Sequence, residues 1–225
     1  MGANLAVQDS GSSRDRILDV AEELFARRGY SGVGMREVAA EVGLGKSSLF
    51  HHFSGKVELY LEVLNRVLER IHVRLRDALA APGCSAERLD RGIDALIDGL
   101  VDEPSSARLL LRALFEDENL PPGSDQLAEH QAGERTLQQI LGDIHELIRE
   151  GVKSGEFRSV SAAHTIQTII GATAYHFASG EFGRELIGSP LLDPDAVASR
   201  RAEVKAMLHH GLVAREPVSG EGGKE

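Results

Sequence analysis

The sequence predicts an all-α protein, with a small N-terminal domain of three helices and a larger C-terminal helical domain. Apolar residues recur every three or four positions along most of the 225 residues, which is the spacing of one helix face. No segment shows the alternation of apolar and polar residues that predicts a strand. Proline and glycine end the apolar stripes one after another, so the helices are expected to be separate elements.

The first helix is expected over residues 14–28. Gly29 predicts its end, and Ser13 is expected to cap its start. The preceding segment, 1–13, lacks the basic region and apolar block of a secretory signal, and we expect it to be a flexible tail. The apolar stripe of this helix consists of Ile17, Val20, Ala21, Leu24 and Phe25.

Residues 36–56, REVAAEVGLGKSSLFHHFSGK, predict two short helices joined by a glycine turn. Val38, Ala39 and Val42 form the first stripe, Gly43 and Gly45 interrupt the pattern, and Leu49, Phe50 and Phe53 form the second. This spacing is typical of a helix-turn-helix, whose second helix lies in the major groove of DNA. That helix should begin near Lys46 and present on its open side Lys46, Ser47, Ser48, His51 and His52. The three-helix bundle is expected to bury Leu24, Phe25, Val38, Leu49 and Phe53.

Residues 40–47, AEVGLGKS, also come close to a phosphate-binding loop. Gly45, Lys46 and Ser47 stand in the order of that motif, with Ala40 in place of its first glycine. A phosphate-binding loop follows a buried strand, whereas residues 35–42 have helical periodicity. A nucleotide-binding protein is therefore kept only as the alternative from another functional class.

A long helix is expected to start at Lys56 and to end before Pro82 and Gly83. Its length would be about 25 residues, or about 37 Å at the rise of an α-helix. The free N–H groups at its start, together with Lys56, are suited to bind a DNA phosphate. We place the DNA-binding domain at 14–55, an effector-binding and dimerisation domain at 56–214, and a second flexible tail at 215–225.

Four short motifs follow one another between residues 25 and 59. They are F-x-x-x-G-Y at 25–30, V-A-x-x-x-G at 38–43, L-F-x-H-F at 49–53 and S-G-K-x-x-L at 54–59. Together they resemble the N-terminal domain of TetR-family transcriptional regulators. The resemblance implies a homodimeric regulator that binds double-stranded DNA. Departures stand at Val33 and Gly34, at Gly45 in place of a capping Ser or Thr, and at Phe50 in place of Tyr, so we expect a lighter hold on the phosphates.

The DNA-binding candidates divide by chemistry. Lys46, Ser47, Ser48 and His51 are suited to base edges or nearby backbone, because they carry hydrogen-bonding groups on the reading helix. The other candidates are Arg36, His52 and Lys56 as phosphate ligands and Phe50 at the position of the usual Tyr.

Composition limits the class of protein further. The single cysteine excludes an intramolecular disulfide, and no apolar run is long enough to cross a membrane, so we expect a cytoplasmic protein. The formal net charge is −10, but residues 1–60 hold seven Lys or Arg and eight Asp or Glu, which leaves −9 for the remainder. The acidity therefore lies away from the predicted DNA-binding domain.

The last two helices are expected to form the dimer. Residues 161–179 are apolar or small on most sides and should be buried on more than one face, and Asp193 followed by Pro194 predicts the start of the final helix. The resemblance implies that this pair joins its twin in a four-helix bundle. Such a homodimer would read a palindrome with half-sites about 34–36 Å apart, or a multiple of that distance.

An effector cavity is expected between the helices of the C-terminal domain. Polar and aromatic side chains within its apolar stripes are the candidates, although each is equally compatible with a core or interface position. These candidates are Arg112, Phe115, His145, Tyr175 and His176. The effector itself would be a small molecule of unknown identity.

No motif predicts catalysis, a metal site or a cofactor. We therefore interpret the sequence as a DNA-binding transcriptional regulator, and as a ligand-responsive repressor in particular. A regulator that activates transcription, or that answers to a partner protein, is the alternative within DNA binding.

Overall fold

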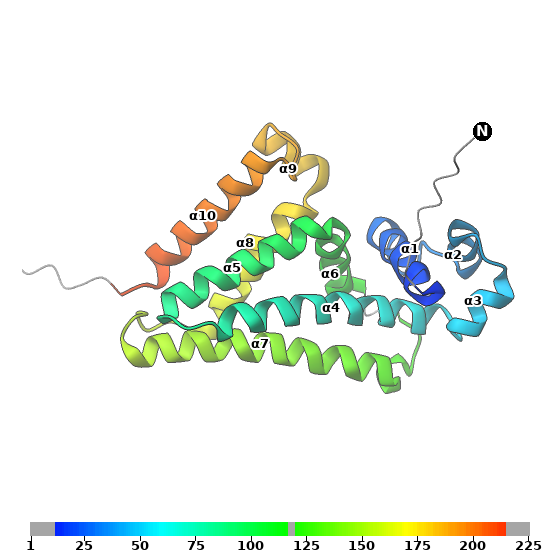
Figure 1. The fold of residues 1–225 in the computed structure, drawn as a ribbon, viewed down its shortest axis with the longest axis horizontal. Coiled ribbons are helices and arrows are strands. Elements are labelled where there is room, and N and C mark those ends of the chain that lie inside the picture. The colour runs from blue at the N-terminus through cyan, green and yellow to red at the C-terminus, as the bar shows by residue number, and fades with distance from the viewer. Residues whose placement is uncertain (1–11, 117–119, 215–225) are drawn as a thin grey trace, which may run out of the picture. The chain divides into compact units, whose positions relative to one another are not determined.

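The protein is described by a computed structural model over residues 12–116 and 120–214, and the side chains of residues 114–116 lie outside the description. The described residues are almost entirely helical, which confirms the predicted all-α class (Figure 1). The helices are α1 (Ser13–Arg28), α2 (Met35–Val42), α3 (Lys46–His52), α4 (Lys56–Ala80), α5 (Ser85–Asp102), α6 (Pro104–Glu116), the 3₁₀ helix η2 (Ser124–Gln126), α7 (Ala128–Ser154), α8 (Ala162–Ala178), α9 (Gly180–Ile187) and α10 (Pro194–Leu212). Within this range no helix has both the length and the apolarity that a membrane span needs.

Helix α1 begins one residue earlier than predicted, because Ser12 rather than Ser13 is its cap. The Ser12 side chain accepts a hydrogen bond from the Asp15 N–H, and the Asp15 carboxylate accepts one from the Ser12 N–H, each at 3.2 Å. The two residues satisfy each other's backbone groups only at this three-residue spacing. The predicted end at Gly29 is confirmed.

The chain forms two compact units. The first is built from residues 1–70 and 103–137, and the second from residues 71–102 and 138–225. Helix α6 thus belongs to the same compact unit as the first three helices, and it packs against α1. These units do not coincide with the domain boundary that we expect at residues 55 and 56.

The core of the first unit contains the apolar residues that the sequence predicts there. Leu24, Phe25, Val38, Leu49 and Phe53 are each at most 2 % exposed. Tyr60 of α4 joins them, with its ring centroid 5.0 Å from that of Phe25 and 5.2 Å from that of Tyr30. Edge-to-face packing of this kind stabilises the contact between α1 and the start of α4.

In the second unit a ladder of ion pairs joins α5 to α10. Three acidic residues spaced four apart on α5 face three basic residues spaced four apart on α10. The pairs are Asp98 with Arg201, Asp94 with Arg201 at 2.8 Å and with Lys205 at 2.7 Å, and Asp90 with His209 at 2.9 Å. Burial alone would raise the pKa of Asp94, but hydrogen bonds and charge from Lys205 and Arg201 outweigh it and hold that pKa below its usual value.

The turn between α7 and α8 is fixed by close packing. Phe157 is 2 % exposed, lies against Gly151 of α7, and donates its N–H to the Gly151 carbonyl at 2.8 Å. Phe157 also forms an isolated antiparallel bridge with Val213, just after α10. The neighbouring Glu156 carboxylate accepts the Ser85 N–H at 2.6 Å, so it caps the start of α5.

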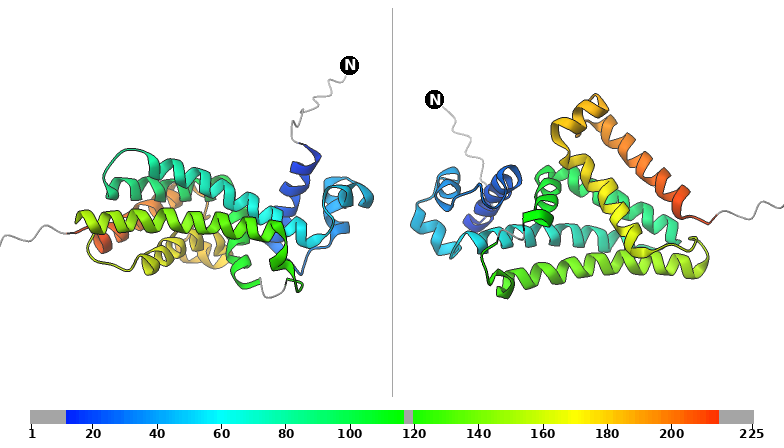
Figure 2. Two further views of the ribbon diagram at one scale, coloured as in Figure 1. Left: turned by 90° about the horizontal axis from the view of Figure 1, so that it is seen from below. Right: turned by 180° about the vertical axis from the view of Figure 1, so that it is seen from behind.

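Two features of the C-terminal helices differ from a simple reading of the sequence. Within the chain, Ile169 and Phe177 of α8 are covered whereas Gly171 and Tyr175 are exposed, so the burial of α8 on a second face stays a prediction for the dimer. The short helix α9, which joins α8 to α10, was not predicted (Figure 2). Its two glycines weaken the helical signal of residues 180–187, because glycine is a poor helix former.

Candidate DNA-binding interface

The turn between α2 and α3 depends on two glycines. Gly43 adopts a left-handed conformation with φ of 76°, which glycine tolerates without steric cost. The N–H groups of Gly43 and Leu44 satisfy the last carbonyls of α2, at Ala40 and Ala39. Gly45 then caps α3 without a side-chain hydrogen bond, as its residue type predicts.

Helix α3 buries Leu49 and exposes its polar residues. Leu49 is 0 % exposed, so it anchors the helix to the core of the first unit. The structure brings five predicted candidates to the surface of α3: Lys46, Ser47, Ser48, Phe50 and His51. His52 is half-buried, and Arg36 on α2 is exposed. This one-sided arrangement is what a helix needs to present side chains to a DNA groove.

Phe50 does not share the buried face of Leu49 and Phe53. Its side chain is 40 % exposed, and the Lys46 ammonium lies 5.4 Å from the centre of its ring. A residue directly after Leu49 points about 100° away on a helix, so Phe50 falls on the open side. The ring is therefore available to a ligand at this surface, together with the cation beside it.

Lys56 stands at the start of α4, as the sequence predicts. Its ammonium lies 4.2 Å from the centre of the Tyr30 ring, and partial burial lowers the pKa of Lys56. Just before α4, the Ser54 N–H donates a hydrogen bond to the Glu58 carboxylate at 2.7 Å. The Tyr30 ring therefore holds the side chain of Lys56, and the hydrogen bond of Ser54 with Glu58 closes the turn that precedes α4.

The phosphate-loop alternative is not supported by the structure. A helix, α2, precedes the glycine turn where that motif needs a strand.

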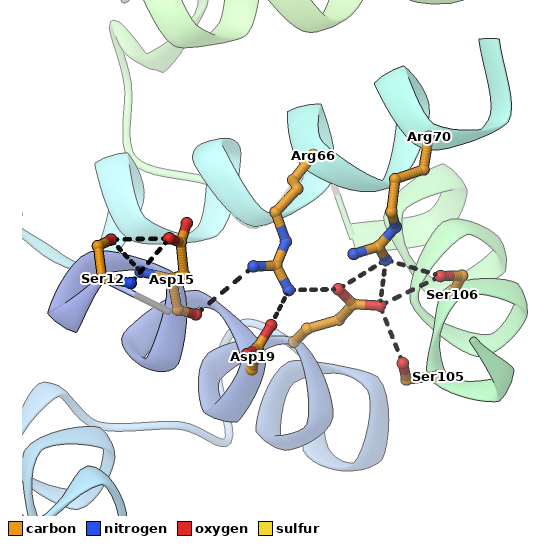
Figure 3. A network of polar contacts seen from close by, with 8 residues as sticks. Ser12, Asp15, Asp19, Arg66, Arg70, Ser105 and Ser106 are labelled. Atoms are coloured by element: carbon orange, nitrogen blue, oxygen red, sulfur yellow. Dashed lines mark hydrogen bonds and ion pairs between the residues drawn. The ribbon is translucent and has the colours of Figure 1, made fainter. Parts of the chain in front are cut away.

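Sequence reasoning missed a buried carboxylate in α1. Glu22 is 2 % exposed, and its oxygens accept hydrogen bonds from Arg70 of α4 at 2.8 Å and from Ser105 and Ser106 of α6 at 2.9 and 3.1 Å (Figure 3). Arg66 lies 3.5 Å from the same carboxylate and also pairs with Asp19. We call Glu22, Arg66, Arg70, Ser105 and Ser106 the Glu22 cluster. Its signal in the sequence is a Glu one position after Ala21, on the side of α1 that the apolar stripe buries.

The predicted effector residues fall in both compact units. In the first unit, Arg112 donates to the Arg27 carbonyl at 3.3 Å, and the Phe115 side chain lies outside the described residues. In the second unit, His145 and Tyr175 are exposed. His176 is buried, its Nε2 lies 3.0 Å from the Leu191 carbonyl, and burial lowers the pKa of its imidazole.

The second unit carries one open groove where α8 begins and α10 ends. Its volume is about 410 Å³, and Arg158, Ser161, His164, Thr168, Met207 and Leu212 contribute to its lining. None of the five predicted effector residues is among the residues that line it.

Two family models match the chain. One, described as "Bacterial regulatory proteins, tetR family", matches residues 17–63, which contain α2 and α3. The other, described as "Tetracyclin repressor-like, C-terminal domain", matches residues 86–208, more than half of the chain. The chain belongs to the TetR family. The first match includes the exposed candidates of α3, and the predicted resemblance is confirmed.

TetR-family relatives agree with this assignment. The transcriptional repressor KstR2 of Mycobacterium tuberculosis is 35 % identical over 147 residues, which cover 65 % of this chain and 70 % of that protein. The transcriptional activator FasR of Mycolicibacterium smegmatis is 36 % identical over 97 residues, which cover 43 % of this chain and only 44 % of FasR. The solved structure of KstR2 from Mycobacterium tuberculosis has a TM-score of 0.73 and 20 % identity, over 91 % of this chain and 97 % of that one. The fold and the class of DNA-binding transcriptional regulator follow.

Proposed function

We propose that this TetR-family protein is a cytoplasmic, ligand-responsive repressor that binds a palindromic operator as a homodimer. The observation that carries the proposal is the exposed side of α3, where Lys46, Ser47, Ser48 and His51 stand together opposite the buried Leu49. Lysine and serine side chains can bind base edges as well as phosphates. Arg36, His52 and Lys56 would then bind phosphates on either side of the groove.

Two variants test this DNA-binding surface. The probe is the duplex that the parent protein enriches from a random library. Lys46→Ala and His51→Ala should each weaken binding to that duplex about tenfold, because a good base-edge pair is worth about 1–3 kcal/mol. Lys153→Ala, an exposed lysine on α7, is the matched control and should leave affinity unchanged. If both α3 variants bound the duplex as tightly as the parent protein does, α3 would not be the recognition helix.

The exposed sides of α8 and α10 support a dimer. Small residues recur there at helical spacing, which allows two helix backbones to approach closely. On α8 and α10 they include Ala163, Gly171, Ala198, Ala202 and Ala206, with the larger Tyr175 and Met207 beside them at 53 % and 49 % exposure. A second copy that covers these faces would bury apolar surface from both chains, which is the main driving force of association.

The oligomeric state and the operator geometry are measured separately. Sedimentation velocity at micromolar concentration should give the mass of a dimer, and a monomer would contradict the proposal. Footprinting of the enriched duplex should show two half-sites centred about 10–10.5 base pairs apart, or a multiple of that spacing. A single half-site that the protein occupies with full affinity would rule out two-fold reading.

The direction of regulation has two candidates. Similarity to the repressor KstR2 over two thirds of that protein supports repression, whereas similarity to the activator FasR over a shorter stretch makes activation the second candidate. A reporter gene behind the enriched duplex decides between them, because a repressor lowers expression and an activator raises it. A thermal-shift screen of small acids, amines and acyl-coenzyme A thioesters tests for an effector. An effector that relieves repression must bind the state that does not bind DNA more tightly.

A further inference from the structure

We propose that Glu22 is a positioning residue, which sets the angle of α1, and through it of α3, on α4 and α6. The inference rests on the proposed operator-binding function and adds a residue that touches no DNA. Glu22 is the charged centre of the Glu22 cluster, and its buried carboxylate contacts two arginines of α4 and two serines of α6 (Figure 3). All of these residues belong to the first compact unit.

Helix α1 contacts α4 at several places, among them an ion pair of Arg14 with Glu62 at 2.9 Å and the pairing of Arg66 with Asp19. Near the start of α4, the Phe25 ring packs edge-on against Tyr60. Ten residues further along α4, Arg70 donates to Glu22. At the rise of an α-helix these two places are about 15 Å apart. Contacts spread over this length define the direction of α1. The carboxylates of Asp19 and Glu62 are open to solvent, whereas Glu22 is 2 % exposed.

The contact of Phe25 with Tyr60 and that of Glu22 with Arg70 differ in how strictly they fix geometry. Apolar burial of the two rings is nondirectional, and their edge-on arrangement is a preference that tolerates small rotations. Hydrogen bonds to a buried carboxylate are directional, and any donor that moves away leaves a charge without its partner in a place that water does not reach. Because Ser105 and Ser106 approach Glu22 from α6, the carboxylate ties three helices together at one point.

The angle of α1 reaches the DNA-binding surface through α2. Helix α1 packs against α2, α2 packs against α3, and the Arg16 guanidinium donates to the Val42 carbonyl at the end of α2, at 3.3 Å. A rotation of α1 on α4 therefore turns α3 as well. In a dimer that binds two half-sites, this rotation changes the half-site spacing at which both DNA-binding domains can bind together.

The test measures spacing preference, which a purely structural role would not move. The probes are the duplex enriched by the parent protein and derivatives with one or two base pairs added or removed between the half-sites. The parent should prefer its own spacing about tenfold, since one base pair turns a half-site by about 35°. Glu22→Gln should bind the parental duplex about tenfold more weakly. Its affinities for the different spacings should differ by less than threefold, and a change of this size is within the usual range of coupling between two sites. Asp19→Asn is the matched control, because Asp19 pairs with Arg66 on the exposed side, and it should keep the full preference.

A second variant separates positioning from folding. Glu22→Gln with Arg70→Met removes both charges, so no unpaired charge stays buried and the melting temperature should return toward that of the parent. The spacing preference should stay lost in this double variant, because the directional contact is still absent. A preference that returns together with stability would overturn the positioning role, as would a parental preference in Glu22→Gln. Failure of the parent protein to enrich any duplex would instead contradict the proposed function, and the inference would fall with it.

Discussion

Replacing glycine by alanine at two positions of α7 should change the stability of the protein in opposite directions. A Cβ atom at Gly151 would lie 2.3, 2.6 and 2.8 Å from three carbons of the Phe157 ring. Carbon atoms prefer separations of about 3.5–4.0 Å, so the ring would have to move by about 1 Å or more. The Phe157 N–H bond to the Gly151 carbonyl and the bridge to Val213 both oppose that movement.

The size of the effect follows from this geometry. Forcing an extra methyl group into a packed core costs about 1–3 kcal/mol, and expelling the Phe157 ring instead would cost about 1.5–3 kcal/mol. Alanine returns about 1 kcal/mol through its better helix propensity. Gly151→Ala should therefore lower the free energy of unfolding, by up to about 2 kcal/mol. Gly142→Ala, with no atom within 4 Å of its Cβ, should raise it by about 0.5–1 kcal/mol.

Urea unfolding followed by circular dichroism measures both variants. Protein concentration must be kept constant, because the stability of the proposed dimer would depend on it. The expected result is a midpoint that falls for Gly151→Ala and rises for Gly142→Ala. A urea midpoint that rises in both variants would refute the reasoning, since helix propensity would then outweigh the contact with Phe157.

Three further predictions concern the ion-pair ladder, the first helix cap and the dimer. Asp94→Asn should lower stability by about 1 kcal/mol at neutral pH in urea unfolding, a value discounted because a third of the side chain is exposed, and Asp98→Asn should have a smaller effect. Since folding depresses the pKa of Asp94, its contribution is present above the usual aspartate pKa and disappears as pH falls through the lowered value, so the two proteins should converge in acid. Ser12→Ala should lower stability by about 1 kcal/mol in the same assay, because α1 loses its cap. Ala202→Glu places a charge on the exposed side of α10 and should shift sedimentation from dimer to monomer while helicity is kept.

Part of the site could be predicted because its signals are local. The glycines at 43 and 45 and the apolar Leu49 determine where α3 begins and which side it buries, and these depend only on nearby residues. The length of α4 was predicted correctly for the same reason, since its stripe runs unbroken until Pro82 and Gly83. The assignment to the TetR family likewise follows from motifs within 35 consecutive residues, 25–59.

Contacts between distant residues could not be predicted in this way. Ser105 and Ser106 lie more than 80 positions from Glu22, and nothing in their neighbourhood indicates that they close around a carboxylate. Helix α9 was missed because glycine weakens its helical signal, although a Cβ at Gly183 would lie 2.9 Å from that of Ser179, one helical turn earlier.

The sequence by itself determined the all-α class, most helix limits, the family and the open side of α3. All of these follow from periodicity, capping and short motifs, which act over a few residues. Only the tertiary structure decided that α6 packs on α1, that Glu22 is buried between three helices, and which side of α8 the chain itself covers. Those facts depend on which helix faces pack against each other, and the free energy of this packing comes from residues that are far apart in the chain.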